Sequence, residues 1–312
     1  MNVSASAICS LSMRPRRWPR ARLLFLALGL AALVGHAQML PSDQSSERPT
    51  AVQAGGHTGL DFKCYPGSII VVRGSVGNLE NLHFLIDTGT NQSVVDRRLA
   101  SRLGLTIRHG RMGVLGHEVS AEQAVLADIK LGPLTMKSLS VSALDLRFLG
   151  QSLHVRIDML IGLDMLGQRN FSIDYESKRL VFGHVPALPL ALPMESGPPF
   201  VTVLAHLDGV SYRLLVNTAA SRVILFNTNK QGLMREIKIE RADIATNSAG
   251  EEVVCKQARL GHLRLGDKEF TPGAVCLVND EGKPYDGLLP IPALGFKEVA
   301  FDFERHILWL RK

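Results

Sequence analysis

The second half of this 312-residue chain repeats the first, and this duplication constrains the fold more than any other feature of the sequence. Segments 158–182 and 286–310 align at a constant offset of 128 residues. The identical pairs are Asp158/Asp286, Leu160/Leu288, Leu166/Leu294, Gly167/Gly295, Asp174/Asp302, Glu176/Glu304 and Leu180/Leu308. A repeat of this kind predicts two similar structural units.

The repeated segments have the pattern of β-strands. Each copy ends in alternating apolar residues around an Asp-aromatic pair, which is the period-2 signal of a strand or hairpin. Further upstream, residues 84–90 align with 214–220 at an offset of 130. One short helix is expected at Val95–Leu103, ending before Gly104. We therefore expect an all-β, bilobal protein made of two homologous β-barrel lobes with short helices.

A proline-rich stretch at 183–199 divides the two halves. Because proline cannot donate to a sheet ladder, this stretch reads as an extended linker. We expect a flexible lead-in at 38–66, the first lobe at 67–185, a linker at 186–196 and the second lobe at 197–312.

The N-terminus has the features of a secretory signal peptide at 1–37. Five arginines precede the apolar run Leu23–Gly35, and cleavage is expected after Ala37. The run is shorter than the ~20 residues that span a bilayer, so we expect no stable membrane anchor once it is removed. The mature chain would be exported to the periplasm or the extracellular space. It keeps 35−5 = 30 basic against 29 acidic side chains, so a nucleic-acid partner is not expected.

The cysteines and histidines indicate at most one disulfide and no metal. Cys64, Cys255 and Cys276 remain after the leader, and Cys255–Cys276 is the expected pair because both lie on neighbouring predicted strands. The alternative is that all three are small buried apolar residues. The histidines are scattered and no HExxH motif occurs, so neither a metal nor an organic cofactor is predicted.

The residues that suggest chemistry are Asp87-Thr88-Gly89-Thr90, which directly follow an apolar strand. A carboxylate buried there is costly unless backbone donors or a partner stabilise it. With the apolar loop Leu160-Ile161-Gly162 about seventy residues later, the motif resembles the pepsin-like and retropepsin-like aspartic proteases.

That resemblance implies a role for each matching residue. Asp87 would be the catalytic aspartate of the first lobe. Thr88 and Thr218 would bond across the lobe interface, and Thr90 would bond the outer oxygen of the Asp87 carboxylate. Leu160, Ile161 and Gly162 would pack beneath the Asp87 loop. The family binds its substrate as an extended peptide between the lobes, so an extended peptide or protein is the expected partner.

The second lobe departs from the family pattern at the site itself. It reads Asn217-Thr218-Ala219-Ala220, and Pro290 stands where the first lobe has Gly162. Asn217 can donate an amide N–H but cannot exchange a proton, and losing one positioned acid–base group typically costs about 10²–10⁴-fold in rate.

Three interpretations remain open. The first is an aspartic-type endopeptidase that uses Asp87 with Asn217, or with Asp87 of a second chain in a homodimer. The second is a catalytically silent peptide-binding protein. In the third, Asp87 is only a turn aspartate.

Several glycines and aspartates outside the Asp87 motif are expected to have supporting roles. Gly110, Gly113 and Gly116 suggest a flap hairpin over a bound peptide, although an ordinary hairpin explains them equally well. Asp158 and Asp286 occur in both halves, which favours structural hydrogen bonds over catalysis. Asp164 has no acidic counterpart in the second half, where Pro292 stands; a functional role is therefore open for it, although a surface-loop role is the expected one.

Overall fold

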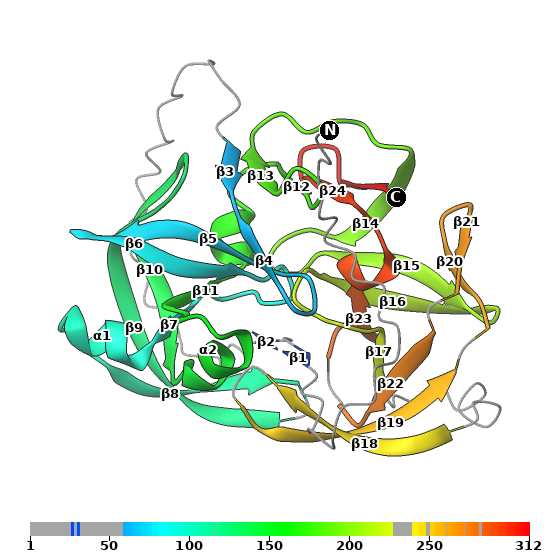
Figure 1. The fold of residues 1–312 in the computed structure, drawn as a ribbon, viewed down its shortest axis with the longest axis horizontal. Coiled ribbons are helices and arrows are strands. Elements are labelled where there is room, and N and C mark those ends of the chain that lie inside the picture. Colours follow the sequence, from blue (N-terminus) through cyan, green and yellow to red (C-terminus); the bar gives the residue numbers. More distant parts are fainter. Residues whose placement is uncertain are drawn as a thin grey trace, which may run out of the picture.

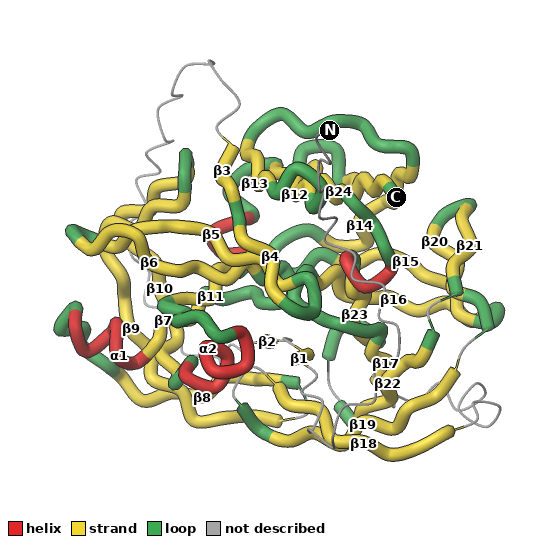
Figure 2. Tube along the Cα trace, in the orientation of Figure 1, coloured by secondary structure: helices red, strands yellow, loops and turns green. Residues whose placement is uncertain are grey.

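The computed structural model describes residues 26–27, 30–31, 59–115, 117–226, 239–247, 250–259, 261–271, 273–280 and 283–312. Within them the chain is built mainly of strands in two sheets, with short helices between them (Figures 1 and 2). The all-β fold expected from the sequence is confirmed. The helices are α1 (Arg97–Arg102), α2 (Arg147–Leu153), α3 (Leu163–Leu166) and the 3₁₀ helix η2 (Pro292–Leu294).

The first lobe is a closed barrel. Its strands run in the order β9-β10-β7-β11-β6-β5, and β5 pairs again with β9 to close the ring. In the middle of β10, Leu139 and Val141 are buried while Ser138 and Ser140 are exposed, so one face of the sheet is turned inward there. The strands are β4 (Lys63–Tyr65), β5 (Ile69–Val76), β6 (Leu79–Ile86), β7 (Val94–Asp96), β8 (Arg108–Val114), β9 (His117–Leu131), β10 (Leu134–Leu144) and β11 (Met159–Ile161).

The second lobe repeats the same strand order. There β19-β22-β17-β23-β16-β15 takes the place of β9-β10-β7-β11-β6-β5, so the duplication seen in the sequence is a duplication of topology. The strands are β15 (Thr202–Leu207), β16 (Val210–Asn217), β17 (Ile224–Phe226), β18 (Ile239–Asn247), β19 (Glu252–Arg259), β20 (Leu263–Leu265), β21 (Lys268–Phe270), β22 (Ala274–Val278) and β23 (Gly287–Pro290).

A shared sheet joins the lobes, in the order β14-β25-β24-β12-β13-β3. Its central pair is β12 against β24, antiparallel, with Phe171 opposite Phe301 and Ser172 opposite Ala300. Ser172 and Ala300 are themselves 128 residues apart, so the pairing is symmetric about this point. The strands are β3 (Gly59–Asp61), β12 (Phe171–Asp174), β13 (Arg179–Phe182), β14 (Leu190–Ser196), β24 (Glu298–Asp302) and β25 (Ile307–Arg311).

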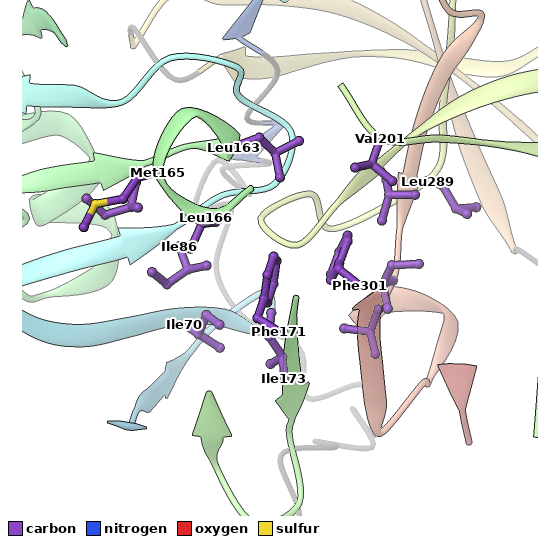
Figure 3. Close-up of a cluster of buried hydrophobic side chains, with 14 of the residues drawn as sticks. Ile70, Ile86, Leu163, Met165, Leu166, Phe171, Ile173, Val201, Leu289 and Phe301 are labelled. Carbon is purple, nitrogen blue, oxygen red and sulfur yellow. The ribbon is translucent and has the colours of Figure 1, made fainter. Parts of the chain in front are cut away.

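The largest hydrophobic cluster crosses this junction and unites the lobes. Phe171 and Phe301 stack with ring centroids 4.5 Å apart, both fully buried. Figure 3 shows them side by side, flanked by Ile86 and Leu166 on one side and by Leu289 and Val201 on the other. Burial of such aromatic surface is the main favourable contribution to a joint core.

In each lobe the strand that leads to the site runs parallel to the strand of the apolar loop. Strand β6 pairs with β11, and β16 pairs with β23. The repeated aspartates fix this arrangement, since Asp158 accepts the backbone N–H of His83 at 2.9 Å and Asp286 accepts that of Arg213 at 2.8 Å. These bonds agree with the structural interpretation of Asp158 and Asp286.

Three expectations about segments need correction. The second half of the proline-rich stretch is not a free linker, because β14 pairs with β25 and β15 and buries Leu190 and Leu192. Part of the expected lead-in is strand, because β3 begins at residue 59 and β4 at residue 63. The helix begins at Arg97, because Asp96 caps it by accepting the N–H of Arg98.

The predicted leader lies mostly outside the described residues. Within it, β1 (Leu26–Ala27) pairs with β18 and β2 (Leu30–Ala31) pairs with β8. Among the residues that the structure describes, no helix has the length and apolar character needed to cross a membrane.

Candidate active site between the two lobes

Asp87 directly follows β6, at the point where the first lobe meets the second. Its backbone N–H donates to Ile161 O at 3.0 Å, so the residue continues the parallel pairing of β6 with β11. The side chain is fully buried. Asp87 is therefore not an exposed turn aspartate, which argues against the simplest of the three interpretations.

Thr88 and Thr218 interlock the two halves. The N–H of Thr88 donates to Thr218 Oγ1 and the N–H of Thr218 donates to Thr88 Oγ1, both at 3.2 Å. Each hydroxyl in turn donates to the opposite strand, Thr88 to Val216 O at 2.9 Å and Thr218 to Ile86 O at 3.2 Å. The four bonds obey the repeat offset of 130, so Asp87 and Asn217 occupy equivalent, adjoining strand ends.

The Asp87 carboxylate is desolvated and has one protein donor. Oδ1 accepts the N–H of Gly89 at 2.8 Å, whereas Oδ2 finds no hydrogen-bond partner among the described residues. Burial raises the pKa of Asp87 to about 7, and the Gly89 bond opposes that rise. This carboxyl therefore changes its protonation state near neutral pH.

Asn217 reproduces the pose of Asp87 without its charge. Its Oδ1 accepts the N–H of Ala219 at 2.6 Å, the counterpart of the Gly89 bond in the first lobe. Because Oδ1 holds that position, the amide nitrogen takes the branch equivalent to Asp87 Oδ2. The amide can donate a hydrogen bond there but cannot take up a proton.

The two loops next to these residues have diverged. Ala219 is buried, and its methyl group packs with a first-lobe cluster that includes Met112 and Val114. In the first lobe, Gly162 is required, because a Cβ there would lie 2.9 Å from both the methyl carbon and the carbonyl oxygen of Thr90. The apolar loop thus packs directly against the Asp87 loop.

Thr90 does not have the partner that the family resemblance implied. Its hydroxyl donates to Gln92 O at 2.9 Å and not to the outer oxygen of Asp87. The main-chain turn after Gly89 brings this nearer acceptor within reach, so Thr90 stabilises the shape of its own loop.

Asp164 is more important than the sequence suggested. Instead of lying on a surface loop, its carboxylate accepts the N–H and the hydroxyl of Ser93, at 2.8 and 2.6 Å. Burial raises the pKa of Asp164, and the Ser93 bonds oppose that rise. The residue that could have indicated this role is Ser93, whose buried hydroxyl lies three residues after Thr90. It belongs neither to the repeat nor to the Asp87 motif, so the sequence pattern did not point to it.

The glycine-spaced segment forms a hairpin that reaches the second lobe. Gly110 and Gly113 lie on β8, which pairs with β9, while Gly116 lies outside the described residues. Beyond β8, Leu115 packs with apolar residues of the second lobe, and its carbonyl accepts from Asn247 Nδ2 at 3.3 Å. Whether this hairpin acts as a flap stays a prediction.

Cys255 and Cys276 form a disulfide between β19 and β22, as their positions on neighbouring strands predicted. Both are buried in the same cluster as Leu288 and Leu115. In the described part of the chain, no group of three His, Cys, Asp or Glu side chains is arranged to hold a metal ion.

Residues 72–165 match the family model described as aspartyl protease. The matched region runs from β5 into α3 and contains both Asp87 and the Leu160–Gly162 loop. No curated protein sequence matches the chain. The match confirms the resemblance to aspartic proteases and supports a protease-type function at the level of the family.

We expect the threonine interlock to contribute strongly to stability. Thr218→Val would leave Thr88 N–H and Ile86 C=O buried without a partner, at about 1–3 kcal/mol each, so the free energy of unfolding should fall by about 2–6 kcal/mol. Urea unfolding would measure the loss. Thr135→Val on the exposed face of β10 is the control and should change stability little; equal effects of the two variants would contradict the prediction.

Burial of Asp87 should make the protein less stable as pH rises. The carboxyl has a folded pKa of about 7 and an ordinary pKa of 3.8, so between these values the folded state holds a proton that the unfolded state has released. Stability therefore falls across this window, by about 4 kcal/mol in total.

Asp87→Asn removes this titration. The variant should be the more stable protein at pH 8, with a difference that shrinks towards pH 4, as urea unfolding at a series of pH values would show. Asp267→Asn, at an exposed turn, should keep the wild-type pH dependence. Parallel stability curves for wild type and Asp87→Asn would refute the prediction.

Proposed function

We propose that the chain is an aspartic-type endopeptidase that hydrolyses peptide bonds with a water molecule activated by Asp87. The observation that carries the proposal is the fully buried Asp87 carboxyl, whose pKa of about 7 lets it act as a base near neutral pH. The family match over 72–165 supports a protease-type activity, and the threonine interlock supports Asn217 as its neighbour.

The proposed reaction needs one carboxylate. Ionised Asp87 takes a proton from water while the water oxygen attacks the peptide carbonyl carbon, whose oxygen accepts a hydrogen bond from the Asn217 amide. Asp87 then gives the proton to the peptide nitrogen as the C–N bond breaks, which yields a free acid and an amine. Asn217 acts as a fixed donor throughout and is never protonated.

The substrate would be an extended peptide or protein. Because Asp87 is fully buried in this structure, the chain around it must open for a peptide to reach it. We further propose that the protein acts after export, in the periplasm or outside the cell. The Cys255–Cys276 disulfide supports an oxidising location.

The second candidate is a silent peptide-binding protein of the same fold. The specific observation in its favour is Asn217, which removes the proton-exchanging partner while keeping the hydrogen-bonding pose. In that case peptides would bind between the lobes and leave uncut.

The rate of peptide cleavage should depend on a single ionisation near neutrality. Because Asp87 must be ionised to act as the base, kcat/KM should rise as pH increases through about 7 and level off above it. A peptide-library digestion across pH would measure this profile. Cleavage should vanish in Asp87→Asn and persist in Asp267→Asn; binding of peptides with no cleavage at any pH would establish the silent candidate instead.

Restoring the second acid should move the activity to lower pH. In Asn217→Asp with Ala219→Gly, two adjoining carboxyls would share one proton, and their pKa values would split. We expect the rate below pH 6 to rise by about 10²–10⁴-fold over wild type. Ala219→Gly alone is the control, because it changes the packing without adding an acid. A folded double variant that gains no acid activity would show that Asn217 does not occupy the partner position.

A further inference from the structure

A buried carboxylate and a buried hydroxyl tie the Asp87 loop to the helix beneath it. Asp164, the second residue of α3, accepts the Ser93 N–H on Oδ2 and the Ser93 hydroxyl on Oδ1. Oδ1 also accepts the N–H of Met165 at 2.9 Å. The 2.6 Å distance from the hydroxyl to a charged acceptor is typical of a strong, charge-assisted hydrogen bond.

The same two segments are joined by further bonds on either side of this pair. Ser93 Oγ accepts the N–H of Gly162 at 3.0 Å, and Thr90 O accepts the N–H of Leu163 at 2.9 Å. The loop that begins at Asp87 is therefore held against the 162–165 segment at both Thr90 and Ser93. Asp164 is the one ionisable side chain among these contacts.

The second lobe builds the same strand order without this connection. The positions equivalent to Ser93 and Asp164 are Val223 and Pro292, at the offsets of 130 and 128. Val223 is buried in the joint core, and Pro292 begins η2. Because the topology survives the loss of both polar groups, the Ser93–Asp164 pair is not a requirement of the barrel. The Ser93–Asp164 pair is found in the lobe that keeps the aspartate, Asp87, and not in the lobe that has Asn217.

We propose that Asp164 is a positioning residue for Asp87, acting through Ser93 to hold the 87–93 loop in the geometry in which the Asp87 carboxyl is shielded from water. The consequence for catalysis rests on the proposed function, whereas the consequence for the Asp87 carboxyl does not. Among the described residues, the hydrogen bonds of the Asp164 carboxylate go to Ser93 and Met165 and not to Asp87, so its effect passes through the loop.

The surroundings of Asp87 make it sensitive to such a change. Its pKa is set by burial and by the Gly89 N–H, and no charged side chain is among the causes of its shift. Asp87 is itself among the groups that act on Tyr285, a buried phenol whose pKa is raised first by burial and then by the charges of Asp280 and Asp87. If the loop loosens and water enters, the pKa of Asp87 must fall towards its ordinary value.

The test is a titration of Asp87 that does not depend on activity. Carbon-13 NMR of aspartate-labelled protein, with the Asp87 signal assigned by its loss in Asp87→Asn, reports the midpoint directly. In Asp164→Asn we expect this midpoint to fall by about one pH unit or more, as expected for a carboxyl that regains hydration. Ser93→Ala should lower it in the same direction, and Ser93→Thr, which keeps the hydroxyl, should restore it.

The matched control is Asp158→Asn in the same lobe. Asp158 is also buried and also accepts a backbone N–H, but it directly precedes β11, and among the described residues its side-chain hydrogen bond and ion pairs go to His83 and Arg156 and not to the 87–93 loop. We expect this control to lower stability while leaving the Asp87 midpoint unchanged. In the active protein, Asp164→Asn should also lower kcat by about tenfold with KM little changed, since misplacement of a reacting group affects the chemical step.

Two results would overturn the proposal. One is a folded Asp164→Asn protein with the wild-type Asp87 midpoint; the other is an equal shift in Asp158→Asn. If Asp164→Asn does not fold, the Ser93→Ala and Ser93→Thr variants test the proposal instead. Equal Asp87 midpoints in these two variants would refute a role for the Ser93 hydroxyl. Failure of wild type to cleave any peptide would refute the proposed function alone, since the NMR midpoints would still be measurable.

Discussion

The reciprocal bonds between Thr88 and Thr218 are the interaction on which the rest of the structure depends. They bring the ends of β6 and β16 together, and they satisfy four backbone groups that would otherwise be buried without partners. With those groups satisfied by side chains of the opposite lobe, water is not needed at the junction. The adjoining Asp87 can then be fully dry, which raises its pKa from 3.8 to about 7. The interlock thus joins the two strand ends at which the buried Asp87 carboxyl lies.

Much of this arrangement could be predicted from the sequence, because a duplicated segment repeats the same residues at a constant offset. The 128-residue offset predicted two equivalent lobes, and the β12–β24 pairing is symmetric at that same offset. The pairing of Cys255 with Cys276 followed from adjacent strands. In each case the signal was a regular spacing, and regular spacing is what strand periodicity and repeats preserve.

The contacts that could not be predicted are those set by tertiary geometry within a single loop. Thr90 bonds Gln92 rather than Asp87, and this partner within the loop is fixed by the folded turn and not by the repeat. Ser93 and Asp164 are 71 residues apart and have no polar counterparts in the second lobe, so neither repeat nor motif connects them. Strand β14 was hard to predict because it contains Pro193 and follows other prolines, yet Leu190 and Leu192 supply a buried face and β25 supplies the pairing.

The differences between the lobes follow one physical rule. A site with two adjoining buried carboxylates must keep a shared proton, because two like charges at short range in a dry environment are very costly. Replacing one acid by Asn217 removes that repulsion, and the amide still satisfies the Ala219 N–H. Once the second charge is gone, the second lobe no longer needs a loop held as firmly as the first. Val223 is buried in the joint core at the position of Ser93, and Pro290 and Pro292, which have no N–H to donate, stand where Gly162 and Asp164 bond Ser93. The first lobe keeps its polar connections because an isolated, desolvated carboxyl is sensitive to every water molecule that a mobile loop would admit.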